Sequence, residues 1–196
     1  FKSTKAVQIK TEIKEVQGEF FKNNDFSLKA ISLEHGTPTN GYIFQEKDKL
    51  RIHKDKLKKL KLKNHKDLKK LTQGKDIKIN NKTIKSKNLT YGQKGKKISF
   101  IFDTKLCSNI KKLAKDSSLA IMESTFFSDK DMKKTKQYKH LTIKEATKIA
   151  KDSNVQKLAL THFSQRYEFK EKELLKEAKK IFKETIIAKD FLKVEV

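Results

Sequence analysis

The chain has 196 residues, with 48 lysines and arginines against 24 aspartates and glutamates, which gives a formal net charge of +24. This length suits one sizeable domain; the single cysteine, Cys107, excludes an intrachain disulfide, and no apolar run approaches the length of a membrane span. We therefore expect a cytoplasmic protein with a polyanionic partner, although a lysine-rich proteome would give the same charge, because only Arg51 and Arg166 are arginines.

The first predicted elements are two strands joined by a turn. Apolar and polar residues alternate over Phe26–Leu33, with a shift near Ile31, which predicts a strand with a possible bulge. His35 and Gly36 follow as a turn, and a second strand is predicted to begin at residues 42–44. The chain therefore presents a histidine just after its first predicted strand.

The character of the chain changes at residues 46–88, where apolar residues become sparse and lysine dominates. Leucines at 57, 60, 68 and 71 predict two short amphipathic helices with narrow apolar stripes. The segment 46–90 is predicted to be an insertion that projects from the core. It is either a solvated low-complexity connector or a basic arm for a phosphate backbone, and we favour the arm.

Strands and helices alternate through the rest of the chain. The predicted strands are 97–102, which is followed by Asp103, then 119–122 and 155–160. A helix with Ile110, Leu113 and Ala114 inward follows the first of these strands. A second helix begins with a capping box of Thr142 and Glu145 and has Ala146, Ile149 and Ala150 inward, and a third covers 169–182. This alternation predicts an α/β domain whose sheet is covered by helices.

Three residues with metal-ligand chemistry follow predicted strands: His35, Asp103 and His162. Imidazoles with a carboxylate suit zinc, and an aspartate can bridge two ions of the kind used for phosphodiester cleavage. The three are separated by more than a hundred residues, and a loop histidine or a helix-capping aspartate would explain each one singly. Their spacing alone therefore leaves the metal site and the structural explanation open.

The segment after the last predicted strand is the most informative in the chain. His162, Ser164, Arg166 and Tyr167 follow the apolar run 155–160, and functional side chains collect where strands end in loops. Arg166 is conspicuous among so many lysines, because the planar fork of arginine suits a phosphate or a carboxylate.

These residues carry a resemblance to the C-terminal part of the ribonuclease Z family, the tRNA 3′-processing endonucleases of the metallo-β-lactamase superfamily. The first matching segments are His35-Gly36 with Gly41-Tyr42 and Glu46-Lys47, and then Asp103-Thr104. Glu123-Ser124-Thr125-Phe126 resembles the His-Glu-Ala-Thr segment of the family, and His140-Leu141-Thr142 resembles its His-Ser-Thr segment. His162-x-Ser164-x-Arg166-Tyr167 matches the last motif of the family completely. Their common order and spacing along nearly the whole chain make the joint metal site the expected interpretation.

The resemblance implies a fold and an activity. The fold would be α/β, the C-terminal part of a metallo-β-lactamase αββα sandwich with a lysine-rich inserted arm. The activity would be that of a zinc-dependent endoribonuclease with two ions, which removes the 3′ trailer from precursor tRNA as a homodimer and grips the tRNA with the arm.

The resemblance also implies residue roles. The metal ligands would be His35, Asp103 and His162; the catalytic residues would be His140 and Glu123; and the substrate-binding residues would be Ser164, Arg166 and Tyr167. His140, held by Glu123, would protonate or stabilise the leaving 3′ oxygen, since a histidine titrates in the useful range.

The chain departs from the family pattern at several positions. Residues 64–68 lack the usual Gly-Pro pair of the arm; Phe102 stands where the family has glycine, and Met122 and Leu141 replace a histidine and a serine. The His-x-His-x-Asp-His motif of the family is absent from residues 1–196, and the resemblance places it upstream of Phe1.

We therefore expect a chain that is inactive alone and needs the N-terminal half of the same enzyme in cis or in trans, because three ligands cannot hold two ions. Two other functions stay open: a metallo-β-lactamase-fold phosphodiesterase of small substrates, and a non-catalytic tRNA-binding subunit.

Overall fold

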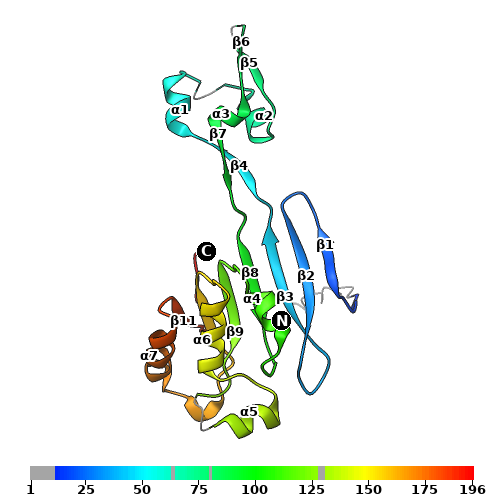
Figure 1. Cartoon of the computed structure of the whole chain (residues 1–196), viewed down its shortest axis with the longest axis vertical. Coiled ribbons are helices and arrows are strands. Elements are labelled where there is room, and N and C mark those ends of the chain that lie inside the picture. Colours follow the sequence, from blue (N-terminus) through cyan, green and yellow to red (C-terminus); the bar gives the residue numbers. More distant parts are fainter. Residues whose placement is uncertain (1–11, 63–64, 80, 128–130) are drawn as a thin grey trace, which may run out of the picture.

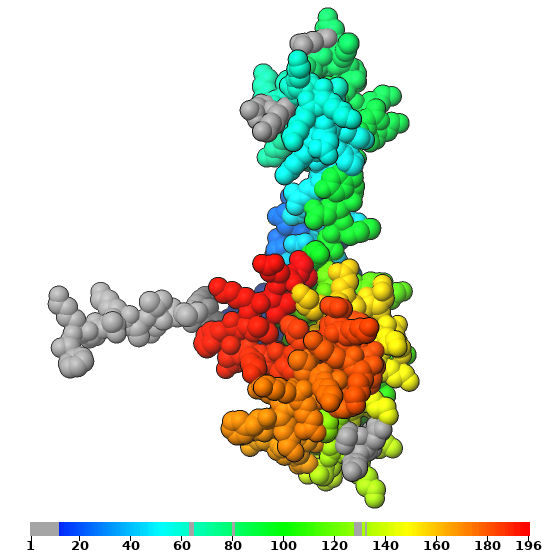
Figure 2. Space-filling view, turned by 90° about the vertical axis from the view of Figure 1, so that its left-hand side faces the viewer, coloured from blue at the N-terminus to red at the C-terminus, as the bar shows by residue number. Residues whose placement is uncertain are grey.

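The chain consists of a body built on one large sheet and an arm that projects from one end of it (Figure 1). This is a computed structural model, and it describes residues 12–62, 65–79, 81–127 and 131–196. The arm stands on a narrow stalk in the space-filling view, where it is coloured cyan to green (Figure 2). Among the described residues, no helix has both the length and the apolar character needed to cross a membrane.

The body is an α/β unit with a mixed sheet of seven strands. Its strands are β1 (Gly18–Lys22), β2 (Phe26–Leu33), β3 (Thr39–Glu46), β8 (Lys97–Ile101), β9 (Leu119–Glu123), β10 (Leu158–Thr161) and β11 (Thr185–Ile187). Its helices are α4 (Ser108–Ala114), α5 (Met132–Tyr138), α6 (Ile143–Asp152) and α7 (Glu171–Ile181), with a 3₁₀ turn η2 (Gln165–Tyr167).

The strands lie in the order β1-β2-β3-β8-β9-β10-β11. The pairs from β1 to β8 are antiparallel, and those from β8 to β11 are parallel. The parallel strands are joined by helical crossovers, as parallel pairing requires. The carboxyl ends of β8, β9 and β10 therefore meet at one edge of the sheet.

One face of the sheet packs on α4, α6 and α7 and forms the main core. This core contains Leu33, Ile43 and Ile101 from the strands with Ile110, Leu113, Ile149, Leu158, Leu174 and Ala178, all buried. Helix α6 begins with the predicted capping box, in which Glu145 N–H donates to the Thr142 hydroxyl and Glu145 accepts from Thr142 N–H. The predicted inward stripes of the three helices are thus explained by one shared core.

The opposite face of the sheet carries a row of half-exposed aromatic rings. Tyr42 and Phe44 flank the inward Ile43 in β3, so their side chains point away from the helices. Phe44 pairs with Leu28 of β2, and its ring centre lies 5.0 Å from that of Phe26. The Phe26 ring in turn stacks on Phe21 of β1, with 5.4 Å between the ring centres. Tyr42 and Phe21 are 42% and 43% exposed, so this face is apolar and accessible.

The arm keeps the register of two strands of the body, although the ladder between them is interrupted and β4 with β7 forms a separate two-stranded sheet. Gln45 pairs with Lys97 in the body, and Lys49 pairs with Gln93 four residues farther along each strand. At the junction Gly95 is required, because a Cβ there would lie 2.1 Å from the Glu46 carbonyl oxygen. The stalk is therefore a lengthened β3–β8 hairpin.

The tip of the arm, which we call the lobe, has a small core of its own. The elements of the arm are β4 (Lys49–Ile52), α1 (Lys54–Lys59), α2 (Leu68–Thr72), β5 (Ile77–Ile79), β6 (Lys82–Ile84), α3 (Ser86–Leu89) and β7 (Thr90–Gln93). Leu57, Leu71, Ile77 and Leu89 are buried together in this core. Leu60, predicted on the same stripe, is 49% exposed, because α1 ends at Lys59 and the chain turns at Lys61 with a positive φ.

Three sequence expectations differ from the structure. The possible bulge in β2 is absent, since all eight of its residues pair with β3; the irregularity lies in β1, between Glu19 and Phe21. The strand predicted over 155–160 begins at Leu158, because Val155 closes the turn after α6 through a hydrogen bond to Ala150. The sequence pattern does not predict strands β1 and β11 or helix α5 of the body, nor helix α3 and the four strands β4, β5, β6 and β7 of the arm.

Candidate metal centre

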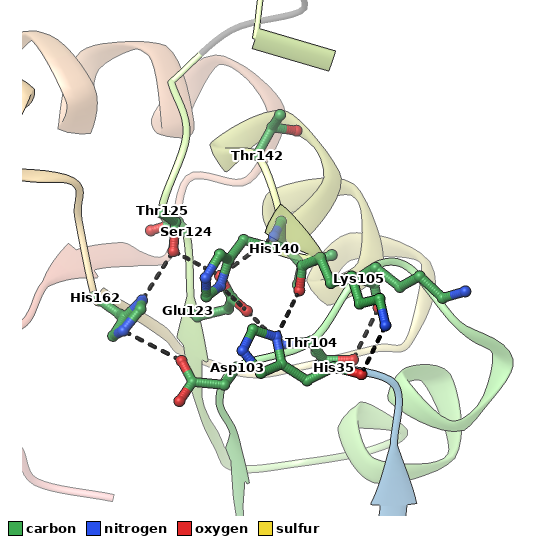
Figure 3. A network of polar contacts seen from close by, with 12 residues as sticks. His35, Asp103, Thr104, Lys105, Glu123, Ser124, Thr125, His140, Thr142 and His162 are labelled. Atoms are coloured by element: carbon green, nitrogen blue, oxygen red, sulfur yellow. Dashed lines mark hydrogen bonds and ion pairs between the residues drawn. The ribbon is translucent and has the colours of Figure 1, made fainter. Parts of the chain in front are cut away.

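A polar cluster occupies the edge where β8, β9 and β10 end (Figure 3). Asp103 follows β8, Glu123 ends β9, and His162 follows β10. His35 enters from the loop after β2, and His140 from the turn after α5. The four candidate side chains His35, Asp103, His140 and His162 thus come from four separate segments that the sheet brings together.

The backbone turns sharply at three places in this cluster. Asp103, Lys139 and His162 have positive φ angles of 47°, 58° and 58°. Aspartate and histidine are among the non-glycine residues that adopt this conformation most readily, and such residues gather at functional sites. At Asp103 and His162 the turn redirects the chain within two residues of the strand end, which places both side chains at the edge.

Three residues have ligand atoms close enough to hold one metal ion. Atoms of Asp103, His140 and His162 all lie within 4.8 Å of one another. This group includes His140, for which the sequence predicted a catalytic role. His35 lies beside the group, with its ring centre 4.8 Å from that of His140, and the His140 ring centre lies 5.3 Å from that of His162. Two of the predicted ligands, Asp103 and His162, therefore lie in one group with His140, and His35 lies next to His140.

Glu123 is the buried centre of the cluster. Its side chain is fully buried, and its carboxylate accepts from the Thr104 backbone N–H, the Thr125 hydroxyl at 2.8 Å and the Leu141 backbone N–H at 3.2 Å. The fourth partner is His140 Nδ1, at 3.0 Å from Oε2. Burying a carboxylate is costly unless it is well hydrogen-bonded, and these four donors offset that cost.

The hydrogen-bond partners fix the same tautomer for all three histidines. His140 Nδ1 faces the Glu123 carboxylate, and His35 Nδ1 lies 3.1 Å from the Lys139 carbonyl oxygen. Both partners only accept, so each Nδ1 carries the proton. His162 Nδ1 lies 2.8 Å from the Thr125 hydroxyl oxygen. Because that hydroxyl gives its single proton to Glu123, it accepts from His162. In its neutral form each imidazole therefore has its lone pair on Nε2, the arrangement typical of metal-binding histidines.

The Asp103 carboxylate tests whether these residues fit a metal ion. Its Oδ1 atom is buried and makes no hydrogen bond with the described residues, although His162 Nε2 lies only 3.2 Å away. A carboxylate oxygen and an imidazole lone pair repel at this distance, and a cation between them, either a proton or a metal ion, removes the repulsion. With a second histidine in reach, the donor set fits zinc, which imidazole nitrogens and carboxylate oxygens bind.

The residues predicted to bind substrate lie on the loop after His162. The Ser164 backbone N–H donates to the Thr125 carbonyl oxygen at 3.1 Å. The Tyr167 hydroxyl donates to Asp131 at 2.6 Å, and Arg166 lies 3.9 Å from the same carboxylate. Burial, and then the hydrogen bond to Asp131, raises the pKa of the Tyr167 phenol. Tyr167 thus anchors the loop, while the Arg166 side chain remains 46% exposed beside the cluster.

Two further residues shape the site without having been predicted to do so. Thr125 was part of a recognised motif, but its hydroxyl link between Glu123 and His162 could not be inferred from the sequence. Lys139 contacts His35 twice, because its carbonyl oxygen accepts from the ring and its ammonium donates to the His35 carbonyl oxygen at 3.1 Å. No sequence signal marked Lys139, since it is one lysine among many.

Comparison with known proteins relates nearly the whole chain to one family. The chain matches no protein-family model. Ribonuclease Z from Bacillus thuringiensis (strain Al Hakam), from Bacillus cereus (strain AH820) and from Bacillus anthracis is in each case 37% identical to the chain over 194 residues. The chain is a ribonuclease Z homologue. These alignments cover 96% of the chain and 63% of each relative, so the homologue spans less than two thirds of their length.

Solved structures show the fold of this ribonuclease Z homologue. Human tRNase Z, short form, superimposes with a TM-score of 0.51 at 23% identity, over 89% of this chain and 44% of the human one. The Bacillus subtilis metallo-β-lactamase fold protein YhfI gives 0.51 at 17% identity, over 86% and 49% of the two chains. A diphosphatase from the PhnP family gives 0.53 at 11% identity, over 93% and 48%. The α/β fold with a mixed sheet therefore matches metallo-β-lactamase-fold structures over roughly half their length.

Proposed function

We propose that this chain supplies the C-terminal part of a zinc-dependent endoribonuclease that removes the 3′ trailer from precursor tRNA. The observation that carries the proposal is the group of Asp103, His140 and His162, whose ligand atoms lie within 4.8 Å of one another, and in which Asp103 Oδ1 is buried without a hydrogen bond from the described residues. This cluster lies in a chain that is 37% identical to curated ribonuclease Z over nearly its whole length.

The residues divide into ligands and proton-handling groups. We assign His35, Asp103 and His162 as metal ligands. Zinc ions held there would polarise a phosphoryl oxygen and lower the pKa of a nearby water. Asp103, with two carboxylate oxygens, is suited to contact both ions, and the buried Glu123 and Thr125 hold the histidine side of the site in place.

His140 is proposed to handle the proton of the leaving group. Its Nδ1 is held by the Glu123 carboxylate at 3.0 Å, which leaves Nε2 as the ring atom available to the site. A protonated His140 would donate from Nε2 to the departing 3′ oxygen, and Glu123 would act as the positioning residue. Since His140 also lies within ligand distance of Asp103 and His162, zinc binding by a His140 variant separates the two roles.

Arg166 is proposed to contact a phosphate of the RNA near the scissile bond, from the loop that Tyr167 anchors. Its side chain is half exposed, its guanidinium lies 5.9 Å from the centre of the Phe126 ring, and its Nη1 lies 3.9 Å from Asp131 Oδ1. Ser164 begins this loop, and we propose that it contributes to the same contact.

Within the part of the chain that the structure describes, this cluster provides too few groups for a closed site with two ions. One carboxylate and three imidazoles cannot fill the coordination shells of two ions. Because the carboxylate is assigned as a ligand, no second carboxylate remains to act as the general base. We propose that a segment with the His-x-His-x-Asp-His motif supplies the rest. The half-exposed aromatic face of the sheet supports a second sheet packing there, as in an αββα sandwich.

The arm is proposed to bind the tRNA through its phosphates. It projects from the body, has its own small core and carries many exposed lysines, which suits a polyanion more than a packing role. We also propose, from the homology, that the assembled enzyme is a cytoplasmic homodimer.

A mixing experiment tests the proposal. The chain and a segment with the His-x-His-x-Asp-His motif are assayed, separately and together, on a precursor tRNA with a 3′ trailer and on bis(p-nitrophenyl) phosphate. We expect zinc-dependent cleavage of the precursor only by the mixture. Activity on the small ester without tRNA affinity would favour a small-molecule phosphodiesterase, and tRNA binding without zinc uptake would favour a binding subunit.

A further inference from the structure

The stalk of the arm has two unlike faces. Leu50, on one face, lines a pocket with residues of the lobe such as Gly74 and Asp76. Arg51 and Tyr91 are paired directly across β4 and β7, so they share the opposite face. Both are exposed. The two-stranded stalk therefore turns one face toward the lobe and presents the other to solvent.

The exposed face combines a guanidinium with an aromatic pair. Arg51 Nε donates to Gln93 Oε1 at 2.6 Å, which orients the guanidinium and leaves its outer nitrogens unused by that contact. The rings of His53 and Tyr91 lie 4.8 Å apart at 44°, and Tyr91 is 47% exposed. We call Arg51, His53, Tyr91 and Gln93 the stalk platform. Its members come from segments about forty residues apart that only the stalk ladder brings together.

The choice of residues in the stalk platform is informative. The chain has 48 lysines and arginines, of which only Arg51 and Arg166 are arginines. Lysine satisfies a general need for positive charge throughout the arm, whereas arginine adds a planar fork that binds phosphate with two nitrogens and stacks on rings. An exposed tyrosine next to it offers the flat surface on which an unpaired nucleobase stacks.

A purely structural role explains only part of this arrangement. A cross-strand pair of arginine and tyrosine does stabilise a two-stranded ribbon. That role does not require the phenol ring to be half exposed, nor the guanidinium to be held by Gln93 at the solvent side. Both features leave the platform ready for a ligand with a flat base and an adjacent phosphate.

We propose that the stalk platform binds a nucleotide of the RNA whose base is unpaired, with the base stacked on Tyr91 and His53 and its phosphate held by Arg51. The proposal rests on the proposed function only in that the ligand is RNA. It gives the stalk a contact with a base, whereas the lysines of the lobe contact phosphates of any sequence. The chemistry shared with free nucleotides is a phosphate beside an aromatic base.

The absence of tryptophan from the chain allows a direct optical test. Tyr91→Trp gives the full chain its single tryptophan, placed on the platform. We expect short single-stranded RNA, with unpaired bases along its length, to quench this fluorescence at the concentration at which it binds. A free nucleoside monophosphate should quench it only at much higher concentration, and heparin, which has charge but no bases, should not quench it.

Substitutions then separate stacking from charge and from stability. Tyr91→Thr keeps a strand-favouring residue without a ring, and we expect it to weaken RNA binding by about tenfold or more. Tyr91→Phe should bind as wild type does. Arg51→Lys should weaken binding several-fold although the charge is kept. Lys78→Gln, in the exposed hairpin of the lobe, is the matched control for loss of one charge. The same variants are compared in the assembled enzyme, with circular dichroism as the check on folding.

The outcomes distinguish the two proposals. If wild-type chain binds neither the short RNA nor a precursor tRNA, the proposed function fails. If it binds both, but Tyr91→Thr and Arg51→Lys bind no worse than Lys78→Gln, the stalk platform is only structural. Equal quenching by heparin and by RNA would also overturn the platform, because it would show a response to charge alone.

Discussion

The candidate metal centre and the arm are built from different residue types and under different constraints. At the metal centre the imidazole Nδ1 atoms and both oxygens of the buried Glu123 have partners, so the geometry is fixed before any ligand arrives. In the arm most lysines extend into solvent from a lobe with a small core. Chemistry requires atoms at defined positions, whereas binding to a phosphate backbone requires charge with freedom to adjust. The substitutions below test whether the two regions are in fact separable.

The largest effect is expected at His140. In the assembled enzyme, His140→Ala should lower the rate of precursor cleavage about 100- to 10,000-fold, the usual contribution of a positioned proton donor. Binding of tRNA should change little, because the proton transfer belongs to the transition state. Single-turnover cleavage and filter binding measure the two quantities. If zinc content falls in parallel with the rate, His140 is instead a ligand. Lys136→Gln, on the neighbouring helix, is the control.

Removal of the arm should affect binding and leave the chemistry intact. Because β3 and β8 stay paired at Glu46 and Lys96, residues 47–95 can be replaced by a two-residue Asn-Gly turn. We expect tRNA affinity to fall about 100-fold or more near 0.1 M salt, and the salt slope to flatten by about 0.7–0.9 for each phosphate that the arm neutralises. Cleavage of bis(p-nitrophenyl) phosphate by the assembled enzyme should be nearly unchanged. Loss of both activities together would show that the arm supports the body.

A smaller effect is expected from the Thr125 hydroxyl. Thr125→Val keeps the shape of the side chain but removes the link between Glu123 and His162, and we expect zinc affinity to fall about 10- to 100-fold. Thr125→Ser, which retains the hydroxyl, should bind zinc nearly as wild type does. The nitrogen chemical shifts of the His162 ring provide a second readout. In Thr125→Val no hydroxyl accepts from His162 Nδ1, so the ring should no longer be held with its proton on that nitrogen. Identical zinc affinity in the two variants would remove Thr125 from the site.

The smallest expected effect concerns Tyr167 at high pH. Its pKa is raised in the folded chain, so the unfolded chain loses this proton first and binds fewer protons in that range. The stabilisation is therefore fully present below a pH of about 10, the ordinary tyrosine pKa, and is lost as the pH rises through the folded value. Denaturant unfolding at increasing pH should show a steeper alkaline loss for wild type than for Tyr167→Phe. Tyr138→Phe, at a half-exposed tyrosine, is the control.

The sequence predicted what depends on local periodicity and on strand ends. The helix stripes through Leu113, Ile149 and Leu174 and the capping box at Thr142 follow from spacing alone, and the structure has all of them. The position of Asp103 and His162 at one edge follows from the rule that parallel strands end together. The individual roles of these residues stay predictions.

The contacts that depend on chain crossings could not be predicted in the same way. The link from Glu123 through Thr125 to His162 needs the loops after β9 and β10 in their final places. The pairing of Arg51 with Tyr91 needs the register of a stalk whose two strands are separated by the whole lobe. Leu60 was misplaced for a related reason, since the last turn of a helix is decided by the chain that follows it.

The unbroken register from β3–β8 into the stalk has a consequence for how this arm can change over time. A chain that leaves and re-enters a sheet through two strands already paired adds almost no closure entropy when the loop between them grows. The lobe can therefore be lengthened, shortened or exchanged while the body keeps its pairing. If the arm binds RNA as proposed, its preference can diverge without any change at the candidate metal centre.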